Sequence, residues 1–383
     1  MSQGSKQYKY LWRKMLDYTV IDLAFKNLRK HKTNRPEIIN IELHYEEERA
    51  AMHDMILNTR PGEVPNPEKA FVSPDHVPVR RYEHGKWRTT YKPGIHEQWL
   101  HHIIAIVLQP IIERTAYPFS CGSLPKKGAH YGMRQLRRKI AKGKNIKYFA
   151  KLDIRHFFDS IRMDIMIREL ASRIKDDWFL YIIRKCYEGF SRGLVLGFYL
   201  SQWLANYLLE PLDKMITDAG YDIYFRYMDD IVVFGPNKRK LHALIVEIKK
   251  LLGRRFRLKL KNNYQVNKFI YKGKGQELDF MGFIFGRNKV VIRKRIMLKA
   301  THLAKRIWMR KQAGGRVYKR HAQAMISYMG WFTYTDSYSC YLKYIKPYIT
   351  VKRLKQLVSR LDKKENRHKN DRMERGALLT AAG

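Results

Sequence analysis

The chain has 383 residues, of which 45% are hydrophobic, enough to bury a sizeable core and to form two or three subdomains. Its 76 lysines and arginines against 35 acidic residues give a formal net charge of +41, which indicates a polyanionic partner, most simply nucleic acid. There is no apolar run of about 18 residues and no recognisable signal peptide, so we expect no membrane association and a cytoplasmic location. Three widely spaced cysteines predict reduced thiols and no zinc site.

The first third of the chain is predicted to be mainly helical. Residues 1–60 place apolar side chains at helical spacing, and residues 61–79 contain five prolines and predict an irregular connection. A periodic apolar stretch from Ile95 to Arg114 predicts a buried helix.

Between these segments, residues 77–91 alternate as strands do around His84 and Gly85, which predicts a basic hairpin. Arg81 and Arg88 lie on opposite arms, where their guanidinium groups could hold a triphosphate. A solvated cationic hairpin with no ligand is the alternative.

A loop rich in glycine follows at residues 119–132. Lys126 and Lys127 lie within it, and backbone amides together with ammonium groups suit a nucleic-acid backbone. A very basic helix is predicted to follow this loop.

The next apolar run, from Tyr148, is predicted to be a strand that ends at Asp153. Aromatic residues follow, and we expect a helix from Ser160 and further helices over residues 163–190. A glycine loop beginning at Gly193 then leads into an apolar helix, where Gly197 is expected to permit close approach of a ligand.

Two apolar runs in residues 223–235 flank a pair of adjacent acids and predict a β-hairpin with Asp229 and Asp230 at its turn. Two carboxylates at about 4 Å and an effective dielectric near 20 repel by roughly 4 kcal/mol, which a divalent cation would relieve. If Asp153 converges with them, the three acids can bind the two metal ions used in phosphoryl transfer. A solvated Asp-Asp turn is the alternative.

The remainder of the chain is basic. Either Lys259 or Lys261 is placed to lie near a leaving pyrophosphate, and the sequence does not choose between them. Residues 278–285 alternate as a strand does, and residues 291–362 are predicted to be helical, with cationic and aromatic side chains suited to a duplex.

The ordered set of Tyr227-Met-Asp-Asp230, Asp153 and Phe158 resembles the palm of reverse transcriptases. Lys86-Trp87-Arg88 resembles their fingers hairpin, and residues 278–285 resemble their primer-grip hairpin. The resemblance implies an α/β right-hand polymerase with fingers, an antiparallel palm sheet and a helical thumb, which synthesises DNA on an RNA template.

The resemblance also implies roles for individual residues. Two Mg²⁺ ions, with Mn²⁺ as a substitute, would be held by Asp153, Asp229, Asp230 and the carbonyl of Ile154. The residues implied to bind the nucleotide are Arg81, Arg88, Phe158, Leu196, Gly197, Ser201 and Gln202, with Phe158 excluding a ribose 2′-hydroxyl. Those implied to bind primer or template are Lys126, Lys127, Tyr227, Met228, Phe280, Met281 and Gly282.

One departure from the common pattern identifies a subfamily. Most reverse transcriptases have Gln-Gly where this chain has Leu196-Gly197, and Ser-Pro where it has Ser201-Gln202. This departure resembles the reverse transcriptases of diversity-generating retroelements in bacteria and phages. Such enzymes copy a structured template-repeat RNA into cDNA from dNTPs with frequent errors opposite adenine. They work with a small, basic, oligomeric accessory protein, the accessory variability determinant.

The predicted domain boundaries are a helical N-terminal extension over 1–75, fingers over 76–150, a palm with further fingers segments over 151–275, a primer-grip hairpin over 276–290, a helical basic thumb over 291–362 and a flexible tail over 363–383.

Other classes of function stay open at this point. A defence-associated or retron reverse transcriptase shares the palm, and a non-catalytic RNA-binding module could retain a dead palm. A group II intron protein is disfavoured, since no endonuclease-like or long DNA-binding extension is expected after the thumb.

Overall fold

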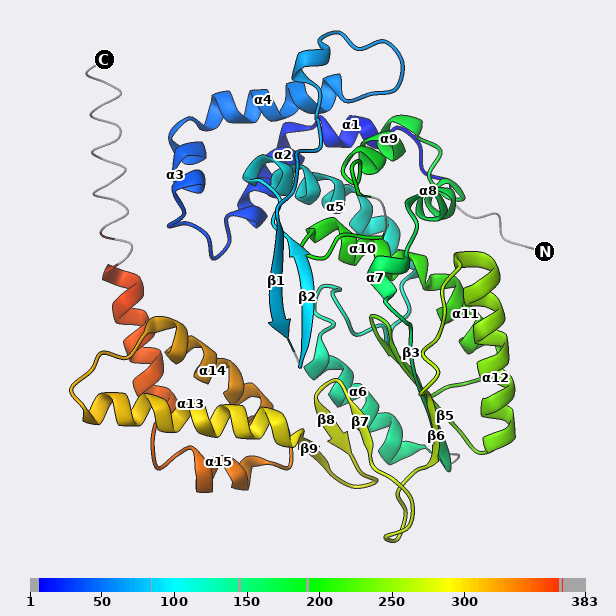
Figure 1. Ribbon diagram of the computed structural model, residues 1–383, viewed down its shortest axis with the longest axis vertical. Helices are drawn as coiled ribbons and strands as arrows, with labels where there is room; N and C mark the ends of the chain where they lie inside the picture. Colours follow the sequence, from blue (N-terminus) through cyan, green and yellow to red (C-terminus); the bar gives the residue numbers. More distant parts are fainter. Residues whose placement is uncertain (1–6, 84, 144–145, 191–192, 365–366, 368–383) are drawn as a thin grey trace. The chain divides into compact units, whose positions relative to one another are not determined.

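The computed structural model describes residues 7–83, 85–143, 146–190, 193–364 and 367 (Figure 1). These residues form two compact units that interleave along the sequence. Unit 1 comprises Met1–Pro118, Asp153–Gly220 and Leu244–Asn263, and unit 2 comprises Phe119–Leu152, Tyr221–Ala243 and Tyr264–Gly383. The domain boundaries predicted from the sequence remain predictions.

Unit 1 is mainly helical. Its first helices are α1 (Leu11–Met15), α2 (Tyr18–Leu28), α3 (Pro36–Leu43), α4 (Tyr45–Asn58), the 3₁₀ turn η1 (Pro67–Lys69) and α5 (Ile95–Thr115). They are followed by α7 (Phe157–Ser160), α8 (Met163–Ala171), α9 (Asp177–Lys185), α10 (Tyr199–Leu208), α11 (Glu210–Asp218) and the π-helical turn η2 (Leu252–Phe256). Helix α12 (Lys238–Leu251) runs from unit 2 into unit 1.

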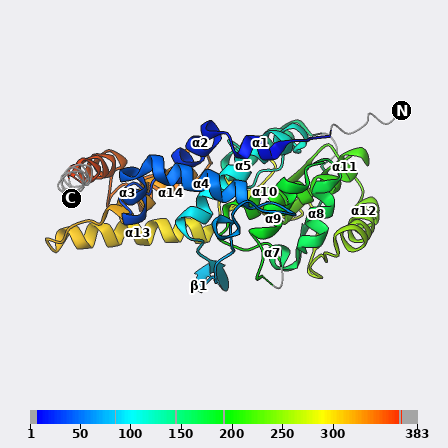
Figure 2. The same ribbon diagram turned by 90° about the horizontal axis from the view of Figure 1, so that it is seen from above.

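The core of unit 1 forms around α5, as the apolar periodicity of that stretch predicts. α2 and α10 both pack against this helix, and Figure 2 shows α2 beside it. Trp99 of α5 is fully buried and donates its indole N–H to the carbonyl of Ile21 in α2 at 2.9 Å. This hydrogen bond satisfies the one polar atom of a large apolar side chain, so Trp99 joins the two helices without an unpaired donor.

Unit 1 also contains a separate two-stranded hairpin, β1 (Pro78–Glu83) with β2 (Lys86–Tyr91), which confirms the hairpin predicted over residues 77–91. The predicted turn residue His84 lies outside the described residues.

The helix expected from Ser160 is a wrong prediction. A short helix, α7, ends at Ser160, and the next helix begins at Met163. Ile161 adopts an extended backbone and is buried, so its packing takes the chain out of the helix between the two elements.

Unit 2 contains two antiparallel arrays. The first has the strand order β4 (Tyr224–Tyr227), β5 (Asp230–Gly235), β3 (Tyr148–Asp153) and β6 (Gln265–Lys268), and the second has the order β7 (Leu278–Phe280), β8 (Phe283–Phe285) and β9 (Val290–Ile292). The helices of this unit are α6 (Ala129–Lys142), α13 (Lys294–Gln312), α14 (Lys319–Thr333) and α15 (Tyr338–Tyr344), and residues 351–364 are also helical.

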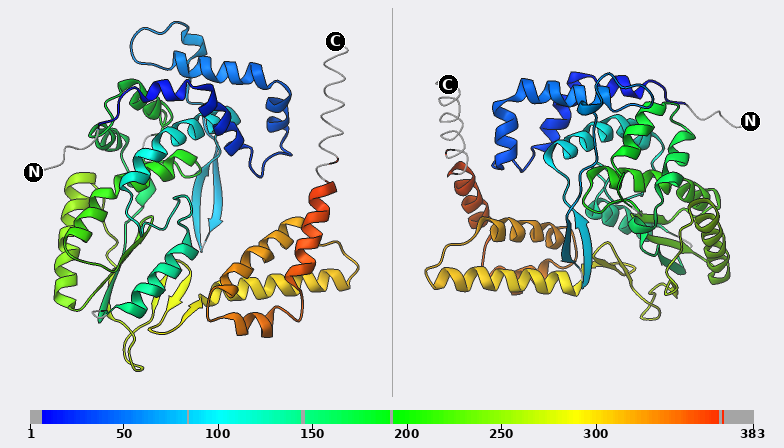
Figure 3. Two further views of the ribbon diagram at one scale, coloured as in Figure 1. Left: turned by 180° about the vertical axis from the view of Figure 1, so that it is seen from behind. Right: turned by 45° about the horizontal axis from the view of Figure 1, so that its top comes forward.

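One apolar core runs through unit 2. Phe149 and Phe234 of the first sheet, Phe283 of the second and Phe332 of α14 belong to the same buried cluster. Figure 3 shows α13 and α14 side by side, and the two helices contact each other. The predicted tail over 363–383 lies outside the described residues, apart from 363, 364 and 367.

Among the residues that the structure describes, none of the helices is both long and apolar enough to cross a membrane. The three cysteines are free, and Cys121 and Cys186 are buried.

Candidate active site

The two adjacent acids lie on the buried hairpin β4–β5. Its register pairs Tyr224 with Val233 and Tyr227 with Asp230, which leaves Met228 and Asp229 as the two-residue turn. Asp229 therefore lies in the turn as predicted, whereas Asp230 is the first residue of β5. Most residues of both strands are buried, so the turn projects from a rigid scaffold.

The turn has an unusual backbone that its surroundings hold in place. Met228 has φ +55°, in the left-handed region, and its carbonyl accepts a hydrogen bond from Nη1 of Arg226 at 3.3 Å. The backbone of Arg226 pairs with a neighbouring segment: its N–H donates to Phe119 and its carbonyl accepts from Cys121 at 2.7 Å. Gly122 completes this support, because a Cβ there would lie 2.8 Å from Cγ of Met228.

Arg226 is a residue that the sequence reasoning missed. Its side chain is among the largest fully buried ones, with 1% of the residue exposed. A guanidinium group is rarely buried without several hydrogen-bond acceptors, so an arginine inside an apolar strand beside two aspartates could have indicated a structural role. Nearby, burial raises the pKa of the Cys121 thiol to about 12, so this thiol stays neutral.

The third acid is the last residue of β3, the strand that neighbours β5 in the sheet order. After Asp153 the chain pairs with residues 259–261: the N–H of Lys261 donates to the Asp153 carbonyl, and the N–H of Arg155 donates to the Lys259 carbonyl, both at 2.8 Å. Ile154 and Leu260 are thus a pair without hydrogen bonds to each other, and the carbonyl of Ile154 points away from that segment.

The Asp153 carboxylate has two different environments. Oδ2 accepts a hydrogen bond from Nζ of Lys261 at 2.5 Å, whereas Oδ1 is buried and has no hydrogen-bond partner among the described residues. Lys259 is exposed. Of the two lysines that the sequence left open, Lys261 thus contacts a predicted metal ligand, and which of them lies near a leaving pyrophosphate stays a prediction.

These oxygen atoms fit a hard divalent cation in their chemistry. A buried carboxylate oxygen without a partner is costly unless a donor or a cation compensates it, and Mg²⁺ prefers carboxylate and carbonyl oxygens. Within the described ranges, however, no group of three or more His, Cys, Asp or Glu side chains is gathered as a metal site. The predicted set of metal ligands therefore remains a proposal.

The hairpin β1–β2 presents its two arginines side by side. Arg81 and Arg88 are register partners, and both are exposed. Like charges directly opposite each other destabilise a two-stranded sheet, so this pair favours an anionic ligand. Tyr82 and Trp87 form the next pair along, on the other face, with 63% and 69% of their surfaces exposed and their rings 5.3 Å apart.

The two phenylalanines after the β3 acid differ in burial. Phe157 is buried, and Phe158 is half-buried with its ring 5.5 Å from that of Phe157. The carbonyl of Phe158 accepts a hydrogen bond from Leu194 at 2.8 Å, which fixes its backbone against the glycine loop. The predicted role of Phe158 in sugar selection stays a prediction.

The structure shows a reason for glycine at one position of the glycine loop. Gly197 has φ +108°, and a Cβ there would lie 2.1 Å from the carbonyl oxygen of Tyr91. The backbone of β2 therefore requires a glycine here, and the predicted approach of a nucleotide to Gly197 stays a prediction. Beside it, the carbonyl of the half-buried Leu196 accepts a hydrogen bond from the N–H of Tyr91 at 2.8 Å.

Ser201 is buried. It is 1% exposed, and its hydroxyl donates to the carbonyl of Val195 at 2.7 Å and lies 3.0 Å from the hydroxyl of Tyr187. These hydrogen bonds hold the loop, and the predicted role of Ser201 in nucleotide binding stays a prediction. Gln202, the next residue, is exposed.

Three predicted primer-binding residues lie in or beside the turn between β7 and β8, and their role stays a prediction. Phe280 and Met281 are buried in the apolar core of unit 2, and a Cβ on Gly282 would lie 2.7 Å from the ring of Trp331. Met281 and Gly282 have φ of +53° and +88° and form the turn between β7 and β8. A primer at this turn would contact backbone atoms, because these side chains face inwards.

The other residues predicted to bind primer or template differ in how exposed they are. Lys126 is exposed with φ +61°, and Lys127 is half-buried. Tyr227 is 37% exposed and Met228 is buried. Burial raises the pKa of the Tyr227 hydroxyl, which therefore remains a hydrogen-bond donor at neutral pH.

An antiparallel sheet with acids where β3 ends and β5 begins, followed by basic helices, defines the class of nucleic-acid polymerases. Residues 77–285 match the family of reverse transcriptases (RNA-dependent DNA polymerases), and the chain belongs to this family. Family membership confirms the predicted α/β fold class of a right-hand polymerase.

Several known proteins are similar to this chain at low sequence identity. An uncharacterized 91 kDa protein in the cob intron of Schizosaccharomyces pombe is 28% identical over 171 residues, which are 40% of this chain and 20% of that protein. Apo telomerase from Candida tropicalis has a TM-score of 0.45 at 10% identity, over 59% of this chain and 50% of that one. Telomerase from Candida albicans, in complex with a fragment of telomeric RNA, has a TM-score of 0.44 at 9% identity, over 79% and 65%.

Proposed function

We propose that this chain synthesises DNA on an RNA template. In this reaction the 3′-hydroxyl of a primer attacks the α-phosphate of a dNTP, the P–O bond to the β-phosphate breaks, and pyrophosphate leaves. The observation that carries the proposal is the order of strands β5 and β3 as neighbours, with Asp229 in the turn before β5, Asp230 at its start and Asp153 at the end of β3. Membership of the family supports it.

In this proposal Asp153, Asp229, Asp230 and the carbonyl of Ile154 would hold two Mg²⁺ ions, which Mn²⁺ could replace. Bound ions of this kind supply positive charge to the attacking and leaving oxygens. Lys261 offsets the charge of Asp153 through their hydrogen bond. Catalysis then depends mainly on positioning and electrostatics.

Residues of unit 1 would bind the incoming nucleotide. The paired guanidinium groups of Arg81 and Arg88 suit the triphosphate, because arginine binds phosphate oxygens in a bidentate way. Phe158 would exclude a ribose 2′-hydroxyl, and the exposed Lys126 of unit 2 would contact the nucleic-acid backbone.

The substitution Asp229→Asn tests this function, because it removes one charge from the turn at almost constant volume. We expect primer extension to fall by at least about 10³-fold, since a metal-held charge contributes several kcal/mol to the transition state. RNA binding should stay within about twofold, because one charge among many changes affinity little. The measurement is extension of an RNA-templated primer at saturating Mg²⁺, with Asp218→Asn in the same chain as the matched control. Near-normal extension by Asp229→Asn would disprove the assignment.

We further propose that the enzyme copies inaccurately, as reverse transcriptases of diversity-generating retroelements do. Leu196 supports this proposal, because its side chain has no hydrogen-bond donor where most members of the family have glutamine. The hydrogen bond from the N–H of Tyr91 to the carbonyl of Leu196 places Leu196 beside the end of the hairpin that carries Arg81 and Arg88. A template-repeat RNA, a small basic accessory protein and a bacterial or phage host belong to the same proposal.

The substitution Leu196→Gln tests whether Leu196 makes copying inaccurate. Polar contacts that separate right from wrong substrates contribute about 1–3 kcal/mol, or roughly 5- to 150-fold in selectivity. We expect Leu196→Gln to lower errors opposite adenine by a factor in this range, measured by sequencing cDNA that both enzymes make on one template. Leu196→Met is the control for side-chain volume, and equal error spectra for all three enzymes would place the inaccuracy elsewhere.

A further inference from the structure

Helix α4 carries a net negative charge in a very basic chain. Helix α4, Tyr45–Asn58, contains Glu46, Glu47, Glu48 and Asp54 against a single arginine, Arg49. Its first turn holds three of the acids, which the positive end of the helix dipole stabilises. An acidic helix repels phosphate groups, so binding of nucleic acid does not explain these acidic residues.

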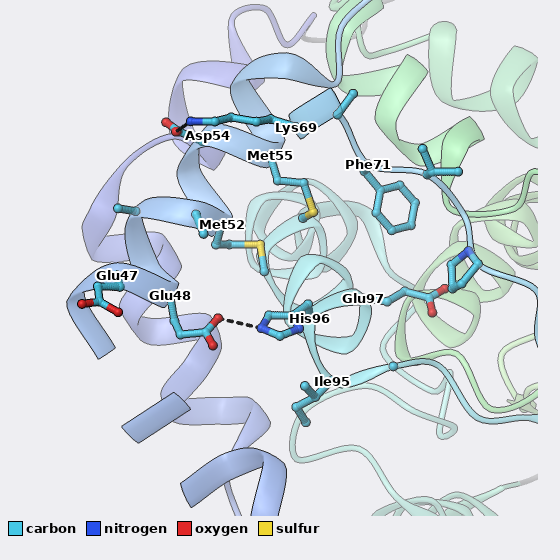
Figure 4. Close-up of a pocket in the computed structure, with 16 residues that line it drawn as sticks. Glu47, Glu48, Met52, Asp54, Met55, Lys69, Phe71, Ile95, His96 and Glu97 are labelled. Atoms are coloured by element: carbon cyan, nitrogen blue, oxygen red, sulfur yellow. Dashed lines mark hydrogen bonds and ion pairs between the residues drawn. The ribbon is translucent and has the colours of Figure 1, made fainter. Parts of the chain in front are cut away.

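The acidic helix forms one side of a pocket of about 720 Å³ within unit 1 (Figure 4). The other sides come from residues 69–74 and from the start of α5, so three separate segments meet there. The volume lies in the range of sites that enclose a ligand or several side chains of a partner.

The pocket combines an apolar floor with an acidic rim. Met52, Met55 and Phe71 line it, and Figure 4 shows the two methionine sulfurs directed into it. Val72, on its edge, has 73% of its surface exposed. Methionine side chains are flexible and polarizable and adapt to varied apolar partners.

The carboxylates of the rim are available to cations. Glu48 accepts a hydrogen bond from His96 at 2.7 Å, and Asp54 accepts one from Lys69 at 2.7 Å, so both already pair with cationic or neutral donors across the pocket. The side chain of Glu47 is 85% exposed. Each carboxylate accepts about four hydrogen bonds, which leaves room for donors from a partner.

We propose that this pocket binds a basic, amphipathic segment of another protein. An apolar side chain of the segment would enter between Met52, Met55 and Phe71, and flanking lysine or arginine side chains would pair with Glu47 and Glu48. Charge complementarity selects this occupant, because the rim is acidic in a chain of net charge +41. The proposal does not depend on polymerase activity.

The test uses the full chain and a fluorescein-labelled amphipathic peptide of lysine, leucine and alanine, with fluorescence anisotropy as the readout. A matched peptide with glutamate in place of lysine controls for apolar binding alone. We expect the lysine peptide to bind the wild-type chain and the glutamate peptide to bind at least about tenfold more weakly. Equal binding of the two peptides would overturn the proposal.

Variants locate the binding. Glu47→Lys combined with Glu48→Lys should weaken binding of the lysine peptide by about tenfold, whereas Glu113→Lys combined with Asp218→Lys, the same charge change outside the pocket, should change it less than about twofold. Val72→Ser, at an exposed position that the fold does not need, should weaken it severalfold. An equal loss in both double variants, or no loss in any of the three, would overturn the proposal.

Two further measurements test whether RNA or a second copy of this chain occupies the pocket instead. The Glu47→Lys and Glu48→Lys double variant should bind single-stranded RNA at least as well as the wild type does, and weaker RNA binding would assign the pocket to nucleic acid. Analytical ultracentrifugation should show the same oligomeric state for the wild-type protein and for this double variant. A loss of self-association in the double variant would instead identify a second copy of this chain as the occupant and overturn the proposal.

Discussion

Two hairpins of this chain carry pairs of like charges, and they are built in opposite ways. In β4–β5 the strands are buried within a four-stranded sheet, and a buried arginine and a glycine-dependent contact hold the turn. In β1–β2 the two strands stand alone as a separate sheet, and Arg81 and Arg88 face each other in solvent.

The difference indicates how each hairpin meets its ligand. A two-stranded sheet alone is marginally stable in water, and a pair of like charges weakens it further. We therefore infer that β1–β2 gains order when an anion neutralises its arginines. The hairpin β4–β5 keeps its geometry without a ligand, because its neighbours determine it. The predictions below test this contrast, beginning with the largest effect.

The buried hairpin should depend strongly on Arg226. Replacing Arg226 by Met removes a buried donor to the carbonyl of Met228, and the loss of a buried hydrogen bond costs about 1–3 kcal/mol. We expect primer extension to fall by about 100-fold with a lower midpoint of thermal unfolding, because the turn that carries Asp229 loses its support. Arg226→Lys, which keeps one donor, should restore part of the rate. Unchanged extension by Arg226→Met at a temperature where the chain is folded would show that the turn needs no such support.

The exposed hairpin should respond in substrate binding rather than in stability. Arg81→Ala or Arg88→Ala should raise KM for dNTPs by about tenfold with little change in the midpoint of unfolding, because each loses a charge-assisted contact worth about 1.5–3 kcal/mol. Arg80→Ala is the matched control, since Arg80 pairs with Thr89 and faces the opposite side of the same strand. If all three variants have the same KM, the hairpin does not bind the triphosphate.

The smallest expected effect concerns how far a nucleotide orders the hairpin β1–β2. Limited digestion with trypsin should cleave after Arg81 or Arg88 before it cleaves after Arg226, because the first two are exposed and the third is buried. Addition of dNTP should slow cleavage at the exposed pair severalfold, as mass spectrometry of the fragments would measure. Cleavage of the hairpin at the same rate with and without dNTP would argue against ordering by the nucleotide.

The sequence predicted those features that depend on local patterns. Two apolar runs on either side of Asp229 and Asp230 predicted the hairpin, and alternation around Gly85 predicted the basic hairpin. The periodicity from Ile95 gave the buried helix α5. In each case the pattern of apolar and polar residues lies within one continuous stretch of sequence, so it can be recognised without knowledge of the fold.

Features that depend on tertiary contacts were not predicted. Nothing local shows that the Ser201 hydroxyl bonds to Val195, or that Phe280 and Met281 belong to a core shared with the basic helices. The need for glycine at 197 was correctly expected, but the atom that approaches it belongs to Tyr91, more than a hundred residues earlier. Likewise, only the fold distinguishes Lys261 from Lys259, because both lie on the same side of an alternating stretch.

The contact between Tyr91 and the glycine loop joins two parts of unit 1 that the sequence keeps apart. Tyr91 is the last residue of β2; its N–H bonds to the carbonyl of Leu196, and its own carbonyl lies where Gly197 has no side chain. A rotation of β2 about this end therefore displaces Leu196 as well. If the hairpin closes on a triphosphate, as proposed, the position of Leu196 would change with it, and the accuracy of copying would then depend on how the hairpin binds the nucleotide.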